Sequence, residues 1–274
     1  MADSTGITPT LRRRGRNFGP GKVGLWGPPI ALLALIIVAA YVANSLLGTR
    51  SFLLPQPHVV LGKLVEPKTA PDIFEALGNT AIVALTGLAI ASLICIVWAI
   101  AMSQARWVER TLFPYAVVLQ AIPIIAITPL IGFSFGYDFP SRVVVAVMIA
   151  LFPMVGNTLF GLQSVDRAHR ELFRLQGASR WTILTKLELR AATPAIFAGL
   201  RISAGLAVVG AIVGDFFFQK GALGLGALMR KYQSRVDNAE LLVTVLVAVL
   251  FGVLVFLLFG LLARLAVGKW YDYS

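Results

Sequence analysis

Two parts of the sequence carry side chains that could do chemistry. The first is Asp215, a carboxylate inside the apolar run 191–219, and the second is the polar, Arg-rich segment 166–194, DRAHRELFRLQGASRWTILTKLELRAATP. An acidic group within a membrane span is by default a candidate for contact with a solute or for a gate. The segment is far longer than the about two to eight residues that normally join packed helices, so we expect it to bind another protein.

The apolar composition identifies an integral membrane protein. Of 274 residues, 58% are hydrophobic and 14% are charged, against roughly 25% charged residues in an average soluble domain. Crossing the hydrocarbon core takes about 20 apolar residues of helix, and the long apolar runs are 23–49, 76–105, 111–137, 143–165, 191–219 and 241–263. We predict an all-α fold with about six transmembrane helices, because no run shows the alternation of a membrane β-barrel.

The basic residues are divided unevenly between the two sides of the predicted membrane. With the N-terminus in the cytoplasm, 15 Lys and Arg residues fall on that side and 8, Arg142 among them, fall on the other. The positive-inside rule then places both termini and the segment 166–194 in the cytoplasm. The first apolar run exceeds the hydrophobic region of a signal peptide, so we expect it to be a retained helix. The formal net charge of +11 therefore reflects topology, not a nucleic-acid partner.

Signatures of catalysis and of energy coupling are missing from the sequence. The stretch GRNFGPGKV departs from a phosphate loop at Arg16 and Val23, so we expect no ATP site on this chain. The two histidines, His58 and His169, fall on opposite sides of the predicted membrane, and the single Cys95 lies mid-span, so no metal site is expected. A proton-coupled carrier usually has a relay of ionisable groups, which disfavours secondary transport, although ion coupling through backbone carbonyls stays open.

Within 166–194 the pattern predicts two short helices separated at Gly177. Glycine tolerates the left-handed backbone that ends a helix, and Ser179 can cap the helix that follows. The apolar side chains of Leu175, Ile183 and Leu187 would then dock against a partner or against the cytoplasmic helix ends. The alternative is an amphipathic helix lying on the lipid headgroups, and the residues alone leave both interpretations open.

Three prolines, Pro114, Pro123 and Pro129, interrupt the third run. Each removes an intrahelical hydrogen bond and kinks or breaks the helix. Broken helices at membrane depth occur where the backbone is buried in protein or lines a water-filled cavity. We therefore consider Gln120, Pro123 and Pro129 as candidates for the translocation pathway, with a kink that only improves packing as the alternative.

The run 191–219 carries small residues at helical spacing as well as Asp215. Gly199, Ser203, Ala207 and Ala211 recur every four residues, which lets helix backbones approach closely. Asp215 falls near the outer end of the run. It is a candidate for contact with substrate or with the outer gate, and the alternative is a structural partnership with a neighbouring helix.

The segment 166–194 resembles the cytoplasmic signature loop of the permeases of binding-protein-dependent ATP-binding cassette (ABC) importers. That pattern is roughly E-A-A-x-x-x-G followed by a helix and I-x-L-P, and Glu171, Gly177 and Leu189 fall on its spacing, with Pro194 on a later proline. The departures are Leu172 and Phe173 in place of the alanines and Arg190 in place of the proline. They affect the details of the surface that would meet an ATPase.

Two further segments extend this resemblance. QAIPIIAITPLIGFSFG, at 120–136, and GLRISAGLAVVGAIVGDFFF, at 199–218, are similar to the third and fifth spans of the nitrate, sulfonate, taurine and thiamine-precursor branch. The similarity extends from Asp72 onward. It implies a type I ABC importer permease with a cytoplasmic tail at 1–25, a first transmembrane helix at 26–48, a five-helix core at 72–267 and a C-terminal tail at 268–274.

The resemblance also implies partners and a location in the bacterial cytoplasmic membrane. Two cytoplasmic ATPases would carry ATP and magnesium, so this chain would hold no cofactor and no metal of its own. A second permease copy would complete a homodimer, and an extracytoplasmic binding protein would deliver a small solute. The ATPase-coupling residues it implies are Glu171, Gly177, Ala178, Ser179, Arg180 and Leu189.

The competing interpretation is a channel or secondary carrier that acts without an ATPase. Basic residues in the outer loops, Lys220, Arg230, Lys231 and Arg235, would favour an anionic solute, although such loops are often simply solvated. An intramembrane enzyme is disfavoured, because the sequence offers no suitable pair of catalytic groups.

Overall fold

The computed structural model describes residues 22–46, 48 and 53–268. The chain divides into two compact units, 1–57 and 58–274. In the first unit, α1 spans Lys22–Leu46, and near its end the Asn44 amide donates to the carbonyl of Leu54 at 2.7 Å and accepts from Gln56 at 3.1 Å. Residues 1–21 of the predicted N-terminal tail and 269–274 of the predicted C-terminal tail lie outside the described residues.

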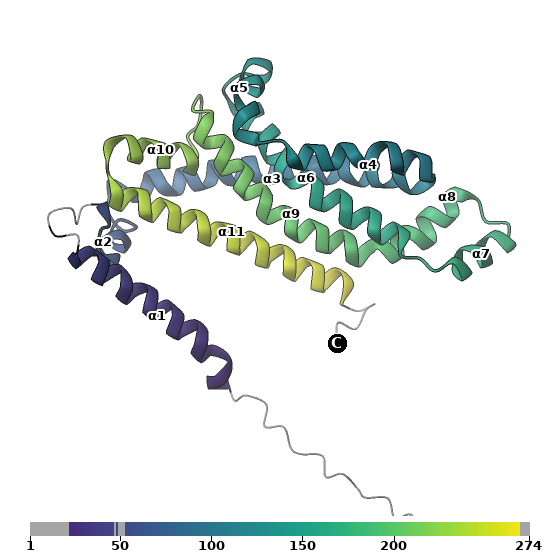
Figure 1. Cartoon of the computed structure of the whole chain (residues 1–274), viewed down its shortest axis with the longest axis horizontal. Helices are drawn as coiled ribbons and strands as arrows, with labels where there is room; N and C mark the ends of the chain where they lie inside the picture. Colours follow the sequence, from purple (N-terminus) through teal and green to yellow (C-terminus); the bar gives the residue numbers. More distant parts are fainter. Residues whose placement is uncertain (1–21, 47, 49–52, 269–274) are drawn as a thin grey trace, which may run out of the picture. The chain divides into compact units, whose positions relative to one another are not determined.

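The regular elements among the described residues of the second unit are all helices, which confirms the predicted all-α fold. Its elements are α2 (Pro57–Gly62, whose first residue closes the first unit), α3 (Ala70–Gln104), α4 (Arg106–Ala121), α5 (Ile124–Phe135), α6 (Phe139–Gln163), α7 (Arg167–Leu175), α8 (Arg180–Ile183), a π-helical turn (Leu184–Glu188), α9 (Leu189–Phe217), α10 (Leu225–Arg235) and α11 (Asn238–Val267). Within this unit, α7 and α8 lie at one end and α10 lies at the other (Figure 1).

Four helices in the described part of the chain are long and apolar enough to cross a membrane. They are α3, α6, the run Arg180–Phe217 that ends with α9, and α11. The α4–α5 pair passes the same test jointly and brings the number to five if it is one bent span. The apolar stretch of α1, Ile30–Leu46, is shorter. The multi-pass architecture is confirmed, and the count of six spans stays a prediction.

The third predicted span breaks sharply at one of its three prolines. The backbone N–H of Ile122 donates to the carbonyl of Val118 at 3.1 Å and closes α4. Pro123 follows immediately and precedes α5, and the two helices meet at 101°. Pro123 lacks the backbone N–H that would have continued the helical hydrogen bonds, so the helix breaks there. Pro114 and Pro129 lie inside α4 and α5.

The small residues of α9 bring its backbone against α6. A Cβ added at Gly210 would lie 2.6 Å from the Cα of Ala146, closer than real Cβ atoms approach other atoms. Seven residues earlier, the hydroxyl of Ser203 donates to the carbonyl of Ala150 in α6 at 2.7 Å, and Ser203 is completely buried. The close approach predicted from the small-residue spacing is confirmed, and the partner is α6 of the same chain.

Two glycine substitutions in α9 test this contact. We expect Gly210→Ala to destabilise the protein by about 1–3 kcal/mol, because the new methyl group meets backbone that cannot rotate away. Gly205→Ala is the matched control in the same helix, since its nearest neighbour would be a Phe256 ring carbon 4.0 Å away. The control should be neutral or slightly stabilising, because Ala has the higher helix propensity. Thermal unfolding of the two purified variants measures the difference, and equal melting temperatures would contradict it.

Candidate functional site

The segment 166–194 contains a helix with a defined start and a defined end. Asp166 caps α7 by accepting from a backbone N–H of its first turn at 3.3 Å. At the other end, the N–H of Gly177 donates to the carbonyl of Arg174 at 2.9 Å and the N–H of Ala178 to that of Phe173 at 3.0 Å. This pair of bonds is a Schellman motif, which needs a left-handed residue. Gly177 supplies it with φ of 71°.

The second helix, α8, begins where the sequence predicts. The Ser179 hydroxyl accepts from the backbone N–H of Thr182 at 3.2 Å and caps it. The predicted break at Gly177 is therefore confirmed, but the second helix is not short: α8 continues through the π-helical turn into α9 as one helix over Arg180–Phe217. Of the apolar side chains expected to dock, Ile183 is buried against the chain itself, whereas Leu175 is 87% exposed.

A group of large apolar side chains is exposed on this otherwise polar segment. Leu172 is 51% exposed and Trp181 is 71% exposed, beside the still more exposed Leu175. Clustered exposed apolar side chains mark surfaces that meet another molecule. We refer to Leu172, Leu175 and Trp181 as the apolar face of the loop.

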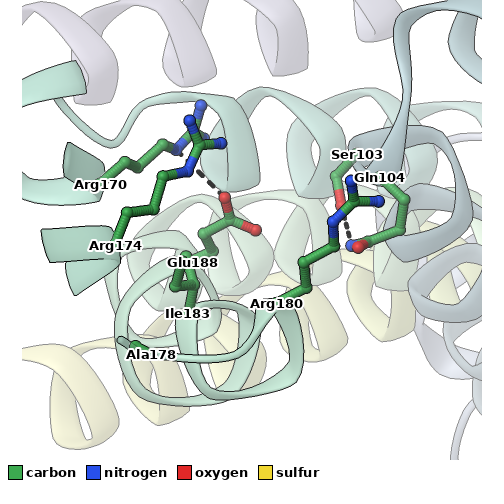
Figure 2. A pocket seen from close by; sticks show the side chains of 8 residues that line it. All are labelled: Ser103, Gln104, Arg170, Arg174, Ala178, Arg180, Ile183 and Glu188. Carbon is green, nitrogen blue, oxygen red and sulfur yellow. Dashed lines mark hydrogen bonds and ion pairs between the residues drawn. The ribbon is translucent and has the colours of Figure 1, made fainter. Parts of the chain in front are cut away.

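One arginine connects α7 to the end of α6 and to the start of α9. Arg170 pairs with Glu188, immediately before α9, at 3.1 Å (Figure 2). It also donates to the carbonyl of Leu162, near the end of α6, at 2.9 Å. A charge-assisted hydrogen bond of this kind is stronger than a neutral one. The loop is thus attached to the ends of both α6 and α9 through a single side chain.

The remaining residues predicted to couple to an ATPase are spread over this loop. Glu171 is exposed and lines a cavity of about 380 Å³ together with four arginines. Ala178 is half-buried, Arg180 is exposed, and Leu189 packs against the buried cluster at this end of the bundle. Their coupling role stays a prediction.

Gln120 and the α4–α5 break lie beside a cavity of about 220 Å³. The cavity is lined by Leu119, Gln120, Ile122, Ile124, Met148, Ile149, Phe152, Pro153 and Leu206, which come from α4, α5, α6 and α9. Gln120 is the single polar side chain among these residues. Pro123 and Pro129 are exposed and are not among them. The pathway role of the three candidates stays a prediction.

Asp215 has no exposed surface and takes part in a buried polar network. Its carboxylate accepts from the hydroxyl of Thr80, in α3, at 2.5 Å, and lies 3.5 Å from the guanidinium of Arg142, in α6. The Thr80 oxygen in turn accepts from the backbone N–H of Leu225 at 2.8 Å. Three helices and the start of α10 therefore meet at this one carboxylate. Contact between Asp215 and a solute would require this network to open.

Arg142 extends the network to the connection between α9 and α10. Its guanidinium donates to the carbonyls of Lys220 and Ala222 in that connection. The glycine at 224 is needed there, because a Cβ at that position would overlap the Asp215 carboxylate. Bonds to Asp215 and to two backbone carbonyls leave the side chain of Arg142 only 2% exposed.

The position of Arg142 corrects one expectation from the sequence. Counting basic residues assigned it to a loop on the outer side, but it lies in α6 and is buried. A charge inside a membrane span normally pairs with another, so the isolated Asp215 was itself a signal that a basic partner existed. Arg142 and Asp215 are 73 positions apart, so the sequence alone did not show that Arg142 was the partner.

Residues 91–269 match the family described as binding-protein-dependent transport system inner membrane component. The chain belongs to this family. The permease is therefore a membrane component of a transport system, as the resemblance in its loop and its third and fifth spans predicted.

Three relatives indicate the branch to which the permease is similar. A riboflavin transport system permease protein of Chloroflexus aurantiacus is 32% identical over 90% of this chain and 89% of the relative. A formylaminopyrimidine transport permease protein of Halalkalibacterium halodurans is 30% identical, with 82% and 88% covered. A nitrate import permease protein of Synechocystis is 25% identical, with 92% and 91% covered. The predicted branch is confirmed.

A pair of carboxylate substitutions tests the structural role of Asp215. Asp215→Asn should cost about 3–5 kcal/mol of stability, because it leaves Arg142 buried without a counter-charge. The control is Asp72→Asn, which removes the exposed Lys231–Asp72 pair at 3.2 Å and should cost at most about 1 kcal/mol. Thermal unfolding of the purified permease distinguishes the two. Wild-type stability of Asp215→Asn would contradict the structural role.

Proposed function

We propose that two copies of this permease form the translocation pathway of an ABC importer, with two cytoplasmic ATPases docked on the loops 166–194. The observation that carries the proposal is the apolar face of that loop, which is exposed on a segment anchored to the transmembrane helices. A side chain such as Leu175, 87% exposed, is covered favourably by a protein groove, at roughly 25 cal/mol per Å² of apolar surface removed from water.

The anchoring explains how motion of a docked ATPase would reach the membrane. The ion pair of Arg170 with Glu188, and its hydrogen bond to the Leu162 carbonyl, connect α7 directly to the ends of α6 and α9. A displacement of α7 would therefore be transmitted to both helices. ATP would favour one packing over another only through differential binding to the two states.

In this proposal the α4–α5 break and the cavity beside Gln120 belong to the solute pathway. Support comes from the 101° bend within a helix pair that is jointly apolar enough to cross a membrane, since irregular backbone inside a membrane is tolerated where it is buried in protein or lines a cavity. Gln120 would offer the solute an amide donor and acceptor in an otherwise apolar lining. Pro123 and Pro129 would keep the two helices from merging into a straight span.

The other assignments follow from the family. ATP and magnesium would bind on the ATPase partners, so the chain would be a transport subunit without a cofactor or catalytic site of its own. An extracytoplasmic binding protein would deliver a small solute to the end of the bundle that carries α10. Both termini and the loop 166–194 would face the cytoplasm of the bacterial cell, in keeping with the distribution of basic residues.

Affinity purification from native membranes tests the importer assignment directly. We expect the detergent-solubilised chain to bring down an ATPase with a Walker-type phosphate loop, identified by mass spectrometry. A chain that purifies without an ATPase, and that transports in liposomes lacking ATP, would instead be a secondary carrier.

Two proline substitutions at left-handed glycines test the loop itself. Gly177→Pro cannot adopt φ of 71° and loses its N–H bond to Arg174, so the turn between α7 and α8 should distort. We expect this variant to reach the membrane but to lose at least tenfold in ATPase recovered and in uptake. Gly136→Pro is the matched control, because Gly136 also has positive φ, 85°, and an N–H bond, to Gly132. Its ATPase recovery should match the wild type, and unchanged uptake in Gly177→Pro would refute the coupling role.

A further inference from the structure

A cavity of about 500 Å³ lies between the loop 166–194 and the end of α3. It is lined by Ser103, Gln104, Arg170, Arg174, Ala178, Arg180, Ile183 and Glu188. Arg170 and Arg174 reach it from α7, and Arg180 reaches it from α8 beside Gln104 (Figure 2). Its volume lies within the roughly 300–1,000 Å³ of small-molecule sites.

The side chains around this cavity carry a surplus of positive charge. Three guanidinium groups converge there, and Glu188 is the one carboxylate among the lining residues. Glu188 is paired with Arg170 and also attracts Arg174, whereas Arg180 has no ion pair within the described residues. Three guanidinium groups that share one carboxylate favour an added anion that accepts several hydrogen bonds, as phosphate oxygens do.

The cavity opens where an exposed apolar stripe of α3 ends. Leu93 and Val97 are 68% and 60% exposed, and Gln104 follows on the same side of the helix, about 20° from Leu93 at about 100° per residue. In a transmembrane helix such a stripe contacts lipid chains. A lipid lying along it would bring its headgroup to the mouth of the cavity, at the boundary between the apolar and the polar parts of the chain.

Part of the apolar face of the loop is turned away from the cavity. Leu172 is two positions from both Arg170 and Arg174, which places it about 160° around α7 from each of them. Leu175 is about 100° from Arg174, and Trp181 directly follows Arg180, so the two surfaces adjoin there. What favours a lipid as the occupant is the apolar stripe of α3 that leads to the mouth of the cavity.

We propose that this cavity binds the headgroup of an anionic phospholipid, with Arg174 and Arg180 as the ligands of its phosphate. Basic pockets at the ends of transmembrane helices recognise anionic headgroups in this way. Arg170, which holds α7 against α6 and α9, also lines the cavity. The bound lipid thus contacts the same loop that we propose to meet the ATPase, but its binding does not depend on that function.

Native mass spectrometry of the full chain in detergent micelles tests the proposal. Phosphatidylglycerol and phosphatidylcholine are titrated separately, and the dissociation constant of the first bound lipid is compared. We expect the wild type to prefer phosphatidylglycerol. Arg174→Gln/Arg180→Gln should weaken phosphatidylglycerol binding about 25-fold, at about fivefold for each basic residue near an anionic group, and leave phosphatidylcholine binding unchanged. Arg174→Lys/Arg180→Lys should retain most of the preference.

The matched control removes two basic residues from the opposite end of the bundle. Lys220→Gln/Arg235→Gln lowers the net charge equally, and both side chains are exposed, so phosphatidylglycerol binding should not change. An equal loss in this control would show general attraction instead of a site and would overturn the proposal. Complete displacement of phosphatidylglycerol by excess inorganic phosphate would do the same, by assigning the cavity to a soluble anion.

Recovery of the ATPase from membranes, measured on the same variants, distinguishes a lipid from a protein partner. If Arg174→Gln/Arg180→Gln binds phosphatidylglycerol as the wild type does but no longer recovers the ATPase from membranes, the arginines contact an acidic protein surface and the lipid proposal is wrong. Loss of phosphatidylglycerol binding with ATPase recovery retained in the single variant Arg174→Gln supports it, because Arg174 is not among the residues predicted to couple to the ATPase. Failure to recover any ATPase with the wild type would reject the importer function and leave the lipid measurement intact.

Discussion

The backbone contact between α6 and α9 is the constraint on which both ends of the described bundle depend. Lipid chains are as apolar as leucine, so helices in a membrane associate through close packing and interhelical hydrogen bonds. Here the glycine at 210 lets the two backbones meet, and Ser203 adds a buried hydrogen bond to the Ala150 carbonyl. Because this contact holds α6 and α9 at a constant separation, side chains can bridge the two helices at both ends.

At each end of the α6–α9 pair, an ion pair between an arginine and a carboxylate connects the two helices. The two ion pairs differ greatly in their burial. Arg142 and Asp215 are 2% and 0% exposed, so separating them would leave two charges unpaired in a low-dielectric interior, at about 3–5 kcal/mol. Arg170 and Glu188 are 29% and 12% exposed, so solvent can hydrate either charge when they separate, at a much lower cost. The buried pair of Arg142 with Asp215 is therefore costly to separate, whereas the more exposed pair of Arg170 with Glu188 separates at low cost.

The sequence was most informative where structure is decided locally. The cap at Ser179, the left-handed Gly177 and the break at a proline of the third run follow from the conformational limits of single residues, and the structure reproduces all three. Small-residue spacing predicted close packing but not its partner, because spacing describes one helix face alone. The role of Arg142 was missed, since its partner is 73 positions away and only the tertiary arrangement of α6 and α9 brings them together.

The packing of the helices also indicates where the bundle can change shape. The cavity beside Gln120 is bounded by α6 and α9 on one side and by the α4–α5 break on the other. Enlarging it by parting α6 from α9 would break a close-packed contact and expose the pair of Arg142 with Asp215. Moving the bent α4–α5 segment disrupts much less, because α5 contacts α6 over a short length and Pro123 already interrupts the backbone ladder. A rigid α6–α9 pair with a displaceable α4–α5 segment is thus the arrangement that packing energies favour.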